Sequence, residues 1–176
     1  FRTFCHFSFS ESLPDETTIC RFRSSLLGKT EQLFNLVLDQ LDKQGFLLRK
    51  GTMVDATIIK ANCKPPCGGE QSEVDPQAGW TKKNDKYTYG YKAHIGVDEG
   101  SGLVINAQTT SAEFHDSQVI NHLVSGEEKA VYADKAYDSK QIRDQLKDNG
   151  ITDRILRKKP KGKEMSNRQK FMNRAY

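Results

Sequence analysis

Two aspartates stand in segments that otherwise have the composition of β-strands. Asp55 lies inside the β-branched run TMVDATIIK, and Asp134 follows the apolar residues of KAVYAD. Aspartate is depleted in strands and an unpaired buried carboxylate is costly, so each residue could instead face solvent or cap a turn. If the two strands are neighbours, the carboxylates converge and need a counter-charge. Mg²⁺ or Mn²⁺ would supply it, and two such ions about 4 Å apart support phosphodiester chemistry.

The elements that must position these aspartates follow from the pattern after Gly51. The β-branched and apolar content predicts strands, and an amphipathic stretch that Asp138 or Ser139 can cap predicts one helix. The strands are expected at 52–60, in two halves of 87–111 joined by the turn DEGSG, at 129–137 and at 151–159, with the helix at 139–149. Gln141 would complete a capping box and Gly150 would end the helix. This order predicts a mixed α/β, or α+β, domain.

The residues before this domain are predicted to be helical. Apolar residues recur at helical spacing in 30–44, with Thr30 placed as N-cap and Gly45 as the stop. A shorter helix is expected in 15–27. The pair could be a DNA-binding helix-turn-helix or only a packing unit. We therefore divide the chain into a helical segment, 1–48, and a catalytic domain, 49–176.

A segment rich in Gly, Pro and polar residues, 61–86, is predicted to be a loop insertion. Its Cys63 and Cys67 would need two further ligands for zinc, and reduced thiols are the simpler interpretation. Further along, Trp80, Lys82 and Lys83 combine an aromatic ring with cations, as a nucleic-acid contact would. Trp80 could equally anchor the insertion in the core.

The positive charge is concentrated at one end of the chain. Residues 154–176 carry nine Lys and Arg against one Glu, whereas the whole chain has a net charge of only +4. Such a block suits nucleic-acid phosphates, although it could also be a solvated tail. The candidate contacts in this basic tail are Arg157, Lys158, Lys159, Lys161 and Lys163. No apolar run is long enough to span a membrane and no signal peptide is recognisable, so a cytoplasmic location is expected.

Four stretches together resemble the insertion-sequence transposases of the IS-five type. They are LPDETTICRFRSSL, GTMVDATIIKA, the segment from DPQAGW to HDSQV, and VYADKAYDSKQIRDQLKDNGI, and they occur in the family's order over most of residues 9–151. The resemblance implies a ribonuclease-H-like fold with a triad of two aspartates and a glutamate. By position, Asp55 and Asp134 correspond to the two aspartates.

The third acid is expected on a helix beyond the last strand, four residues after an arginine. No such Arg-x-x-x-Glu follows Asp134, and Glu164 lies in a predicted loop, so we expect the chain to stop before the catalytic helix. The resemblance also implies two Mg²⁺ or Mn²⁺ ions in a complete enzyme, double-stranded DNA at element ends and target, and a homo-oligomer on DNA. A structure-specific nuclease and an inactive DNA-binding remnant are the alternatives.

Two further segments are candidate DNA contacts. The resemblance places His115, next to Asp116, near the active-site edge, although such a pair is more often a surface hydrogen bond. Lys92 and His94 alternate along a predicted strand and would face one side, where Lys92 could approach phosphates.

Overall fold

The computed structural model describes residues 2–67, 72–83 and 85–175, in two compact units, 1–44 and 45–176. The first unit holds helices α1 (Glu16–Ser25) and α2 (Thr30–Lys43). Helix α1 begins at Asp15, whose carboxylate accepts the Thr18 backbone N–H at 2.7 Å. This hydrogen bond satisfies one of the donors left unpaired at a helix N-terminus.

Helix α2 differs from its prediction at its start. Lys29 occupies the N-cap position with no side-chain cap, and Thr30 is already the first helical residue. The prediction of Thr30 as the cap was therefore wrong. At the other end Gly45 follows the C-cap with φ +76°, a backbone conformation that glycine adopts without strain, so the predicted stop is confirmed.

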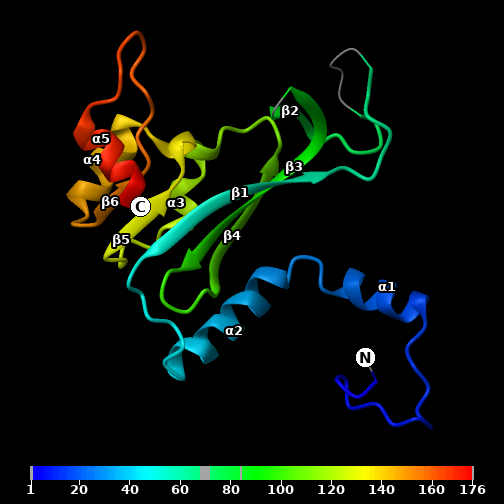
Figure 1. The fold of residues 1–176 in the computed structure, drawn as a ribbon. Helices are drawn as coiled ribbons and strands as arrows, with labels where there is room; N and C mark the ends of the chain where they lie inside the picture. The colour runs from blue at the N-terminus through cyan, green and yellow to red at the C-terminus, as the bar shows by residue number, and fades with distance from the viewer. Residues whose placement is uncertain (1, 68–71, 84, 176) are drawn as a thin grey trace. The chain divides into compact units, whose positions relative to one another are not determined.

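The second unit is built on one twisted sheet (Figure 1). Its strands are β1 (Thr52–Lys60), β2 (Gly79–Lys83), β3 (Lys86–Asp98), β4 (Val104–Ser111), β5 (Ala130–Ala133) and β6 (Thr152–Ile155). The spatial order is β2-β3-β1-β5-β6, and β4 also pairs with β3. Strands β1, β3 and β4 are antiparallel neighbours, whereas β1, β5 and β6 are parallel. This mixed α/β sheet confirms the predicted fold class.

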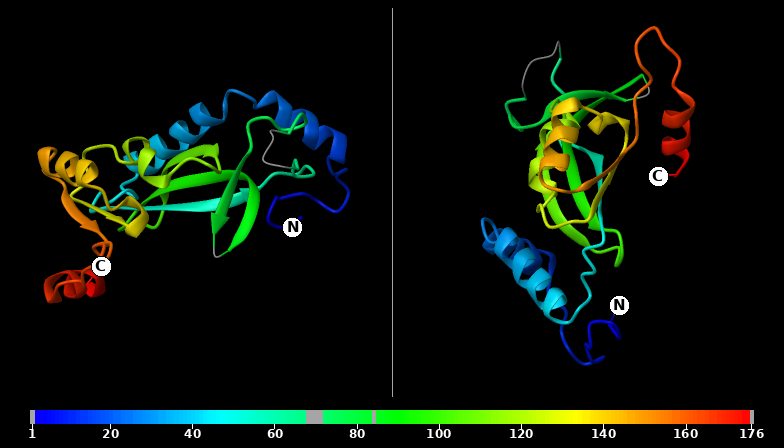
Figure 2. Two further views of the ribbon diagram at one scale, coloured as in Figure 1. Left: turned by 90° about the horizontal axis from the view of Figure 1, so that it is seen from above. Right: turned by 90° about the vertical axis from the view of Figure 1, so that its left-hand side faces the viewer.

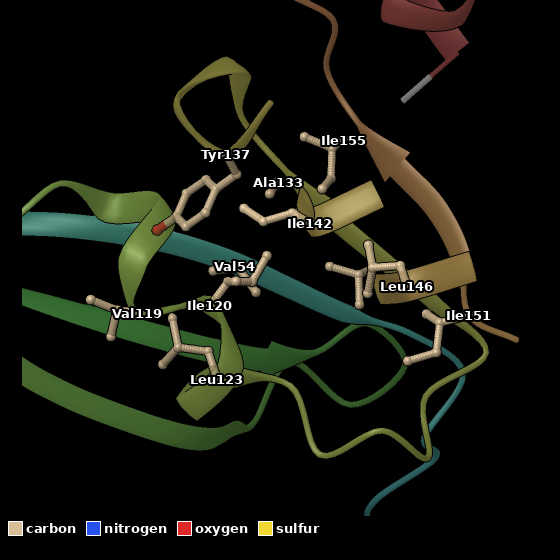
Figure 3. Packing of buried hydrophobic residues seen from close by; sticks show 11 residues of the cluster. Val54, Val119, Ile120, Leu123, Ala133, Tyr137, Ile142, Leu146, Ile151 and Ile155 are labelled. Carbon is tan, nitrogen blue, oxygen red and sulfur yellow. The ribbon is translucent and has the colours of Figure 1, made fainter. Parts of the chain in front are cut away.

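Short helices cover one face of this sheet. They are α3 (Ile120–Leu123) and α4 (Lys140–Asp148), preceded by the 3₁₀ turns η1 (Asp116–Gln118) and η2 (Lys135–Tyr137). Figure 3 shows their apolar side chains meeting those of β1, β5 and β6 in the main core. Leu123 and Val131 are fully buried there. α3 and α4 lie on the side of Val54 and do not cover the opposite face of β1, where Met53, Asp55 and Thr57 are exposed; we call this the open face.

The C-terminal helix α5 (Asn167–Ala175) follows the basic tail and is set apart from α3 and α4 in both views of Figure 2. Its Asn173 amide accepts the Arg157 backbone N–H at 2.7 Å and donates to the Arg157 carbonyl at 3.0 Å. These two hydrogen bonds tie α5 to the segment after β6. The sequence pattern had not predicted this helix.

Several element boundaries in the structure differ from the predicted ones. Strand β5 ends at Ala133, because Asp134 turns the chain and caps η2, so the expected strand over 129–137 was too long. Ser139 is the cap of α4, its hydroxyl accepting the Ile142 N–H at 3.2 Å. The expected strand over 151–159 is shortened to β6. The segment 61–86 is not entirely a loop, because β2 lies within it. Within the described ranges, no helix has the length and apolar character needed to cross a bilayer.

Candidate functional site

Asp55 and Asp134 each follow the last paired residues of two neighbouring parallel strands. The register of β1 and β5 pairs Met53 with Tyr132 and ends with Val54 paired to Ala133, so each aspartate lies one residue beyond the last pair. Paired positions on neighbouring strands lie about 5 Å apart between backbones. Val54 points into the core and is 4% exposed, so by alternation Asp55 points to the open face. The two aspartates that the sequence singled out therefore both lie at the end of the paired stretch of β1 and β5.

Each carboxylate is oriented by one backbone hydrogen bond. Asp55 Oδ1 accepts the Ala56 N–H at 2.8 Å, and Asp134 Oδ1 accepts the Ala136 N–H at 2.7 Å. Among the described residues, neither carboxylate forms an ion pair with a Lys or Arg. Two like charges held side by side without a cation repel each other. Their oxygens are hard ligands of the kind that Mg²⁺ and Mn²⁺ prefer, so the donor chemistry fits a divalent ion.

Among the described residues, no third metal ligand accompanies the two aspartates. In the portion of the chain that the structure describes, no group of three or more His, Cys, Asp or Glu side chains could hold a metal ion. Glu164 lies in the tail and its carboxylate is 3.7 Å from Lys170 Nζ. The prediction that this chain lacks the third acid stays a prediction, and the site as described consists of two carboxylates.

On the side of the sheet opposite the open face, the ammonium of Lys92 has two partners. Its Nζ donates to the Phe114 carbonyl at 2.6 Å and lies 2.9 Å from Asp116 Oδ1. The second contact has the distance of an ion pair but not the direction of a hydrogen bond, since Asp116 Oδ1 has no hydrogen-bond partner among the described residues. The Lys92 side chain is 13% exposed. This contact between β3 and η1 was not predicted, because Asp116 had been considered only as the neighbour of His115.

Tyr137 closes the core next to this ion pair. Its side chain is 1% exposed, and in Figure 3 its hydroxyl points toward the segment that carries Val119. The hydroxyl has no hydrogen-bond partner among the described residues. Burial raises the pKa of Tyr137, and the negative charges of Asp116, Asp55 and Asp134 raise it further. Tyr137 is therefore a neutral phenol within electrostatic range of both candidate catalytic aspartates.

His94 is fully buried on the same side as Lys92, as the alternation predicted. The Thr110 hydroxyl donates to the Ser111 carbonyl at 3.1 Å, so it accepts from His94 Nε2 at 2.9 Å. Burial lowers the pKa of His94, Lys92 lowers it too, and Asp116 acts in the opposite direction. The imidazole is a neutral member of the core.

His115 caps the turn η1. Its Nδ1 lies 2.7 Å from the Ser117 hydroxyl and accepts the Ser117 N–H at 3.3 Å, while Gln118 Oε1 accepts the His115 N–H at 3.3 Å. The ring is exposed, but its partner is Ser117 and not Asp116. A role for His115 at DNA stays a prediction.

The tip of the β2–β3 hairpin carries the lysines of the predicted nucleic-acid contact. Trp80 packs against buried Tyr89 with ring centroids 5.3 Å apart, which supports its alternative interpretation as an anchor. Lys82 Nζ lies 2.8 Å from Asp85 Oδ1 and 5.4 Å from the centre of the Tyr87 ring. Lys83 is exposed.

The basic tail begins at a network of ion pairs. Arg143 of α4 bridges Asp138 and Asp153, and Arg157 lies 3.1 Å from Asp153. Burial raises the pKa of Asp138, but the Lys158 N–H, Arg143 and Arg157 together lower it below its usual value. Arg157 and the Lys158 backbone therefore have structural partners. Lys159, Lys161 and Lys163 are exposed beyond them.

The Cys63–Cys67 loop is described only up to Cys67. All four cysteines of the chain are free thiols, and the Ser72 hydroxyl lies 3.8 Å from Cys63 Sγ. Tyr89 secures the end of this loop: its hydroxyl donates to the Asp75 carbonyl at 2.9 Å and accepts the Ser72 N–H at 3.2 Å. Residues 68–71 of the predicted insertion, and Asn84, lie outside the described residues.

Comparisons with known proteins found a solved structure and a family that the chain matches. A solved structure that resembles the chain is the cryo-EM structure of a piggyBac transposase synaptic complex with hairpin DNA, with 13% sequence identity and a TM-score of 0.40. The likeness covers 65% of this chain and 24% of that one, so the chain spans about a quarter of the transposase it matches. The sequence profile of the family described as "Transposase DDE domain" matches residues 47–176, which include both aspartates and the whole sheet. The chain belongs to the transposase DDE domain family.

Proposed function

We propose that this chain is part of a DNA transposase that hydrolyses a phosphodiester at the end of an insertion sequence and joins the freed 3′ hydroxyl to target DNA. The observation that supports the proposal is that Asp55 and Asp134 each lie one residue beyond the last pair of the neighbouring parallel strands β1 and β5, in a chain of this family. The open face leaves room for a bulky polymeric substrate, and the exposed lysines of the tail supply charge for its phosphates.

In this proposal Asp55 and Asp134 hold Mg²⁺ or Mn²⁺. A bound divalent cation supplies the positive charge that attack on an anionic phosphodiester requires. The chain's own contribution is orientation: the N–H groups of Ala56 and Ala136 each fix one carboxylate oxygen. Fixed ligands need no rearrangement when substrate arrives, and such preorganisation is a main source of catalysis in phosphoryl chemistry. Homo-oligomerisation on DNA belongs to the same proposal.

The test is nicking and joining of a supercoiled plasmid with Mg²⁺, Mn²⁺ or EDTA, using the chain and the longest natural protein that contains it. We expect cation-dependent nicks that end in a 3′ hydroxyl, followed by joining to a second DNA. Asp55→Asn and Asp134→Asn should abolish both steps, while the control Asp144→Asn, exposed on α4, should retain them.

The outcomes separate the alternatives. Nicking without joining would favour a structure-specific nuclease. DNA binding without any cation-dependent nicking in the longer protein would favour a remnant that only binds DNA. Normal nicking by either aspartate variant would refute the assignment of the two carboxylates.

A further inference from the structure

The β2–β3 hairpin has two chemically different faces. Its register pairs Trp80 with Tyr89 and Lys82 with Tyr87, and these pairs share one face because residues alternate along a strand. On this face the Trp80 and Tyr89 rings pack together and Lys82 lies over Tyr87. The side chains on this face therefore contact one another.

The other face carries two cross-strand pairs of residues whose side chains can donate hydrogen bonds. Thr81 is paired with Thr88, and Lys83 is paired with Lys86. Directly opposed residues on antiparallel strands have Cβ atoms about 5 Å apart, and like charges in such a pair are destabilising. Both lysines are exposed, and none of the ion pairs found among the described residues includes either of them.

Lys82 provides the contrast within the same hairpin. Its ammonium has Asp85 at 2.8 Å and the Tyr87 ring at 5.4 Å, so its charge is compensated internally. Within the part of the chain that the structure describes, Lys83 and Lys86 have no such ion-pair partner, and an anion placed between them would relieve their repulsion. The hydroxyls of Thr81 and Thr88 on the same face add donors of the type that contact phosphate oxygens.

We propose that Lys83 and Lys86, supported by Thr81 and Thr88, form a phosphate clamp that holds the backbone of the DNA substrate. The inference rests on the proposed function, because it takes DNA as the substrate, and it deepens that function by locating one backbone contact. In this proposal Lys83 and Lys86 bind the phosphate. Lys82 does not, because its ammonium stabilises the hairpin tip through Asp85 and Tyr87. No base is read by this clamp, so its contribution is independent of sequence.

The experiment measures how the affinity of the full chain for a mixed-sequence duplex of about 20 base pairs depends on salt, by fluorescence anisotropy without divalent cations. Each phosphate contact contributes about 0.9 to the slope of log K against log salt. The double variant Lys83→Gln/Lys86→Gln should therefore flatten the slope by about 1.8. It should fold at least as well as the wild type, because it removes a repulsive pair, and thermal unfolding checks this.

The matched control removes two exposed lysines from α4, an element outside the hairpin: Lys140→Gln/Lys147→Gln. Its change in net charge is the same, and its slope should stay close to that of the wild type. If both double variants flatten the slope equally, only overall charge matters and the clamp is refuted. If the wild type binds DNA and the hairpin variant keeps its full slope, the clamp is also refuted while the proposed function stands. If the wild type binds no DNA, the proposed function fails and the clamp fails with it.

Discussion

Neutralising one of the paired aspartates should stabilise the metal-free protein. Asp55 and Asp134 each lie one residue beyond the last pair of β1 and β5, with no ion-pair partner from Lys or Arg among the described residues. Like charges opposite each other on neighbouring strands are destabilising, and cross-strand pairs contribute about 0.2–1 kcal/mol. Asp55→Asn removes that repulsion but keeps Oδ1 as the acceptor for the Ala56 N–H. We expect the free energy of unfolding in EDTA to rise by about 0.5 kcal/mol, which is about 2 °C in Tm.

The same substitution should remove the response to cations. A protein that binds an ion only when folded gains RT ln(1 + [L]/Kd), so an ion at about ten times its Kd stabilises by about 1.4 kcal/mol. The wild type should therefore melt about 5 °C higher in excess Mg²⁺ or Mn²⁺ than in EDTA. Asp55→Asn should lose most of this shift, because one of the two ligands no longer carries charge.

Differential scanning calorimetry of both proteins, with and without cation, measures the two effects. The control is Asp85→Asn, which changes an exposed carboxylate at a backbone conformation, φ +60°, that asparagine also adopts. It should keep the cation shift. The reasoning is refuted if Asp55→Asn is less stable than the wild type by more than about 1 kcal/mol in EDTA, or if cations stabilise it as much as the wild type.

Three further predictions concern the framework and are measured by urea denaturation. Leu123→Ala should lower the free energy of unfolding by about 3 kcal/mol, since the side chain is fully buried and leaves a cavity. Tyr137→Phe should change stability by less than about 1 kcal/mol, because the hydroxyl has no described partner; a loss above about 2 kcal/mol would reveal a hydrogen bond. Burial raises the pKa values of Asp98, Glu128 and Asp138, but the hydrogen bonds that each carboxylate accepts lower its pKa by more than burial raises it. Each folded pKa therefore lies below its unfolded value. Their contribution is complete above about pH 4.5 and is lost on acidification through the folded pKa values; a flat profile from pH 6 to 3 would contradict this.

The strand that carries Asp55 could be predicted closely from the sequence. The β-branched run at 52–60 has the same limits as β1, because its residues suit a pleated, half-buried surface wherever the strand is placed. The end of β5 was predicted less well. Asp134 was expected to end the strand, but the turn that it caps, residues 135–137, was included in the strand, since the apolar Ala136 and Tyr137 continue the pattern.

The features that the sequence did not reveal depend on contacts between distant residues. Strand β2 exists because Gly79–Lys83 pairs with the start of β3, in a region whose composition is that of a loop. The ion pair of Lys92 and Asp116 joins residues on different elements and needs η1 to lie against β3. Neither contact leaves a periodic signal in the chain, so composition and spacing cannot locate it.

The long strand β3 joins the two sites proposed for DNA, and its length has a geometric consequence. Ile95 is the partner of Asp55 in the register, and Tyr87 lies eight positions earlier at the hairpin tip. At a rise of about 3.3 Å per residue, these positions are at most about 26 Å apart along the strand. Duplex DNA advances about 3.4 Å per base pair, so the same length corresponds to about eight base pairs. A single continuous strand thus fixes how far along the sheet the clamp lies from the carboxylates. By alternation Lys86 falls on the face of β3 opposite to the partner of Asp55, so a duplex that contacts both sites must pass around the edge of the sheet.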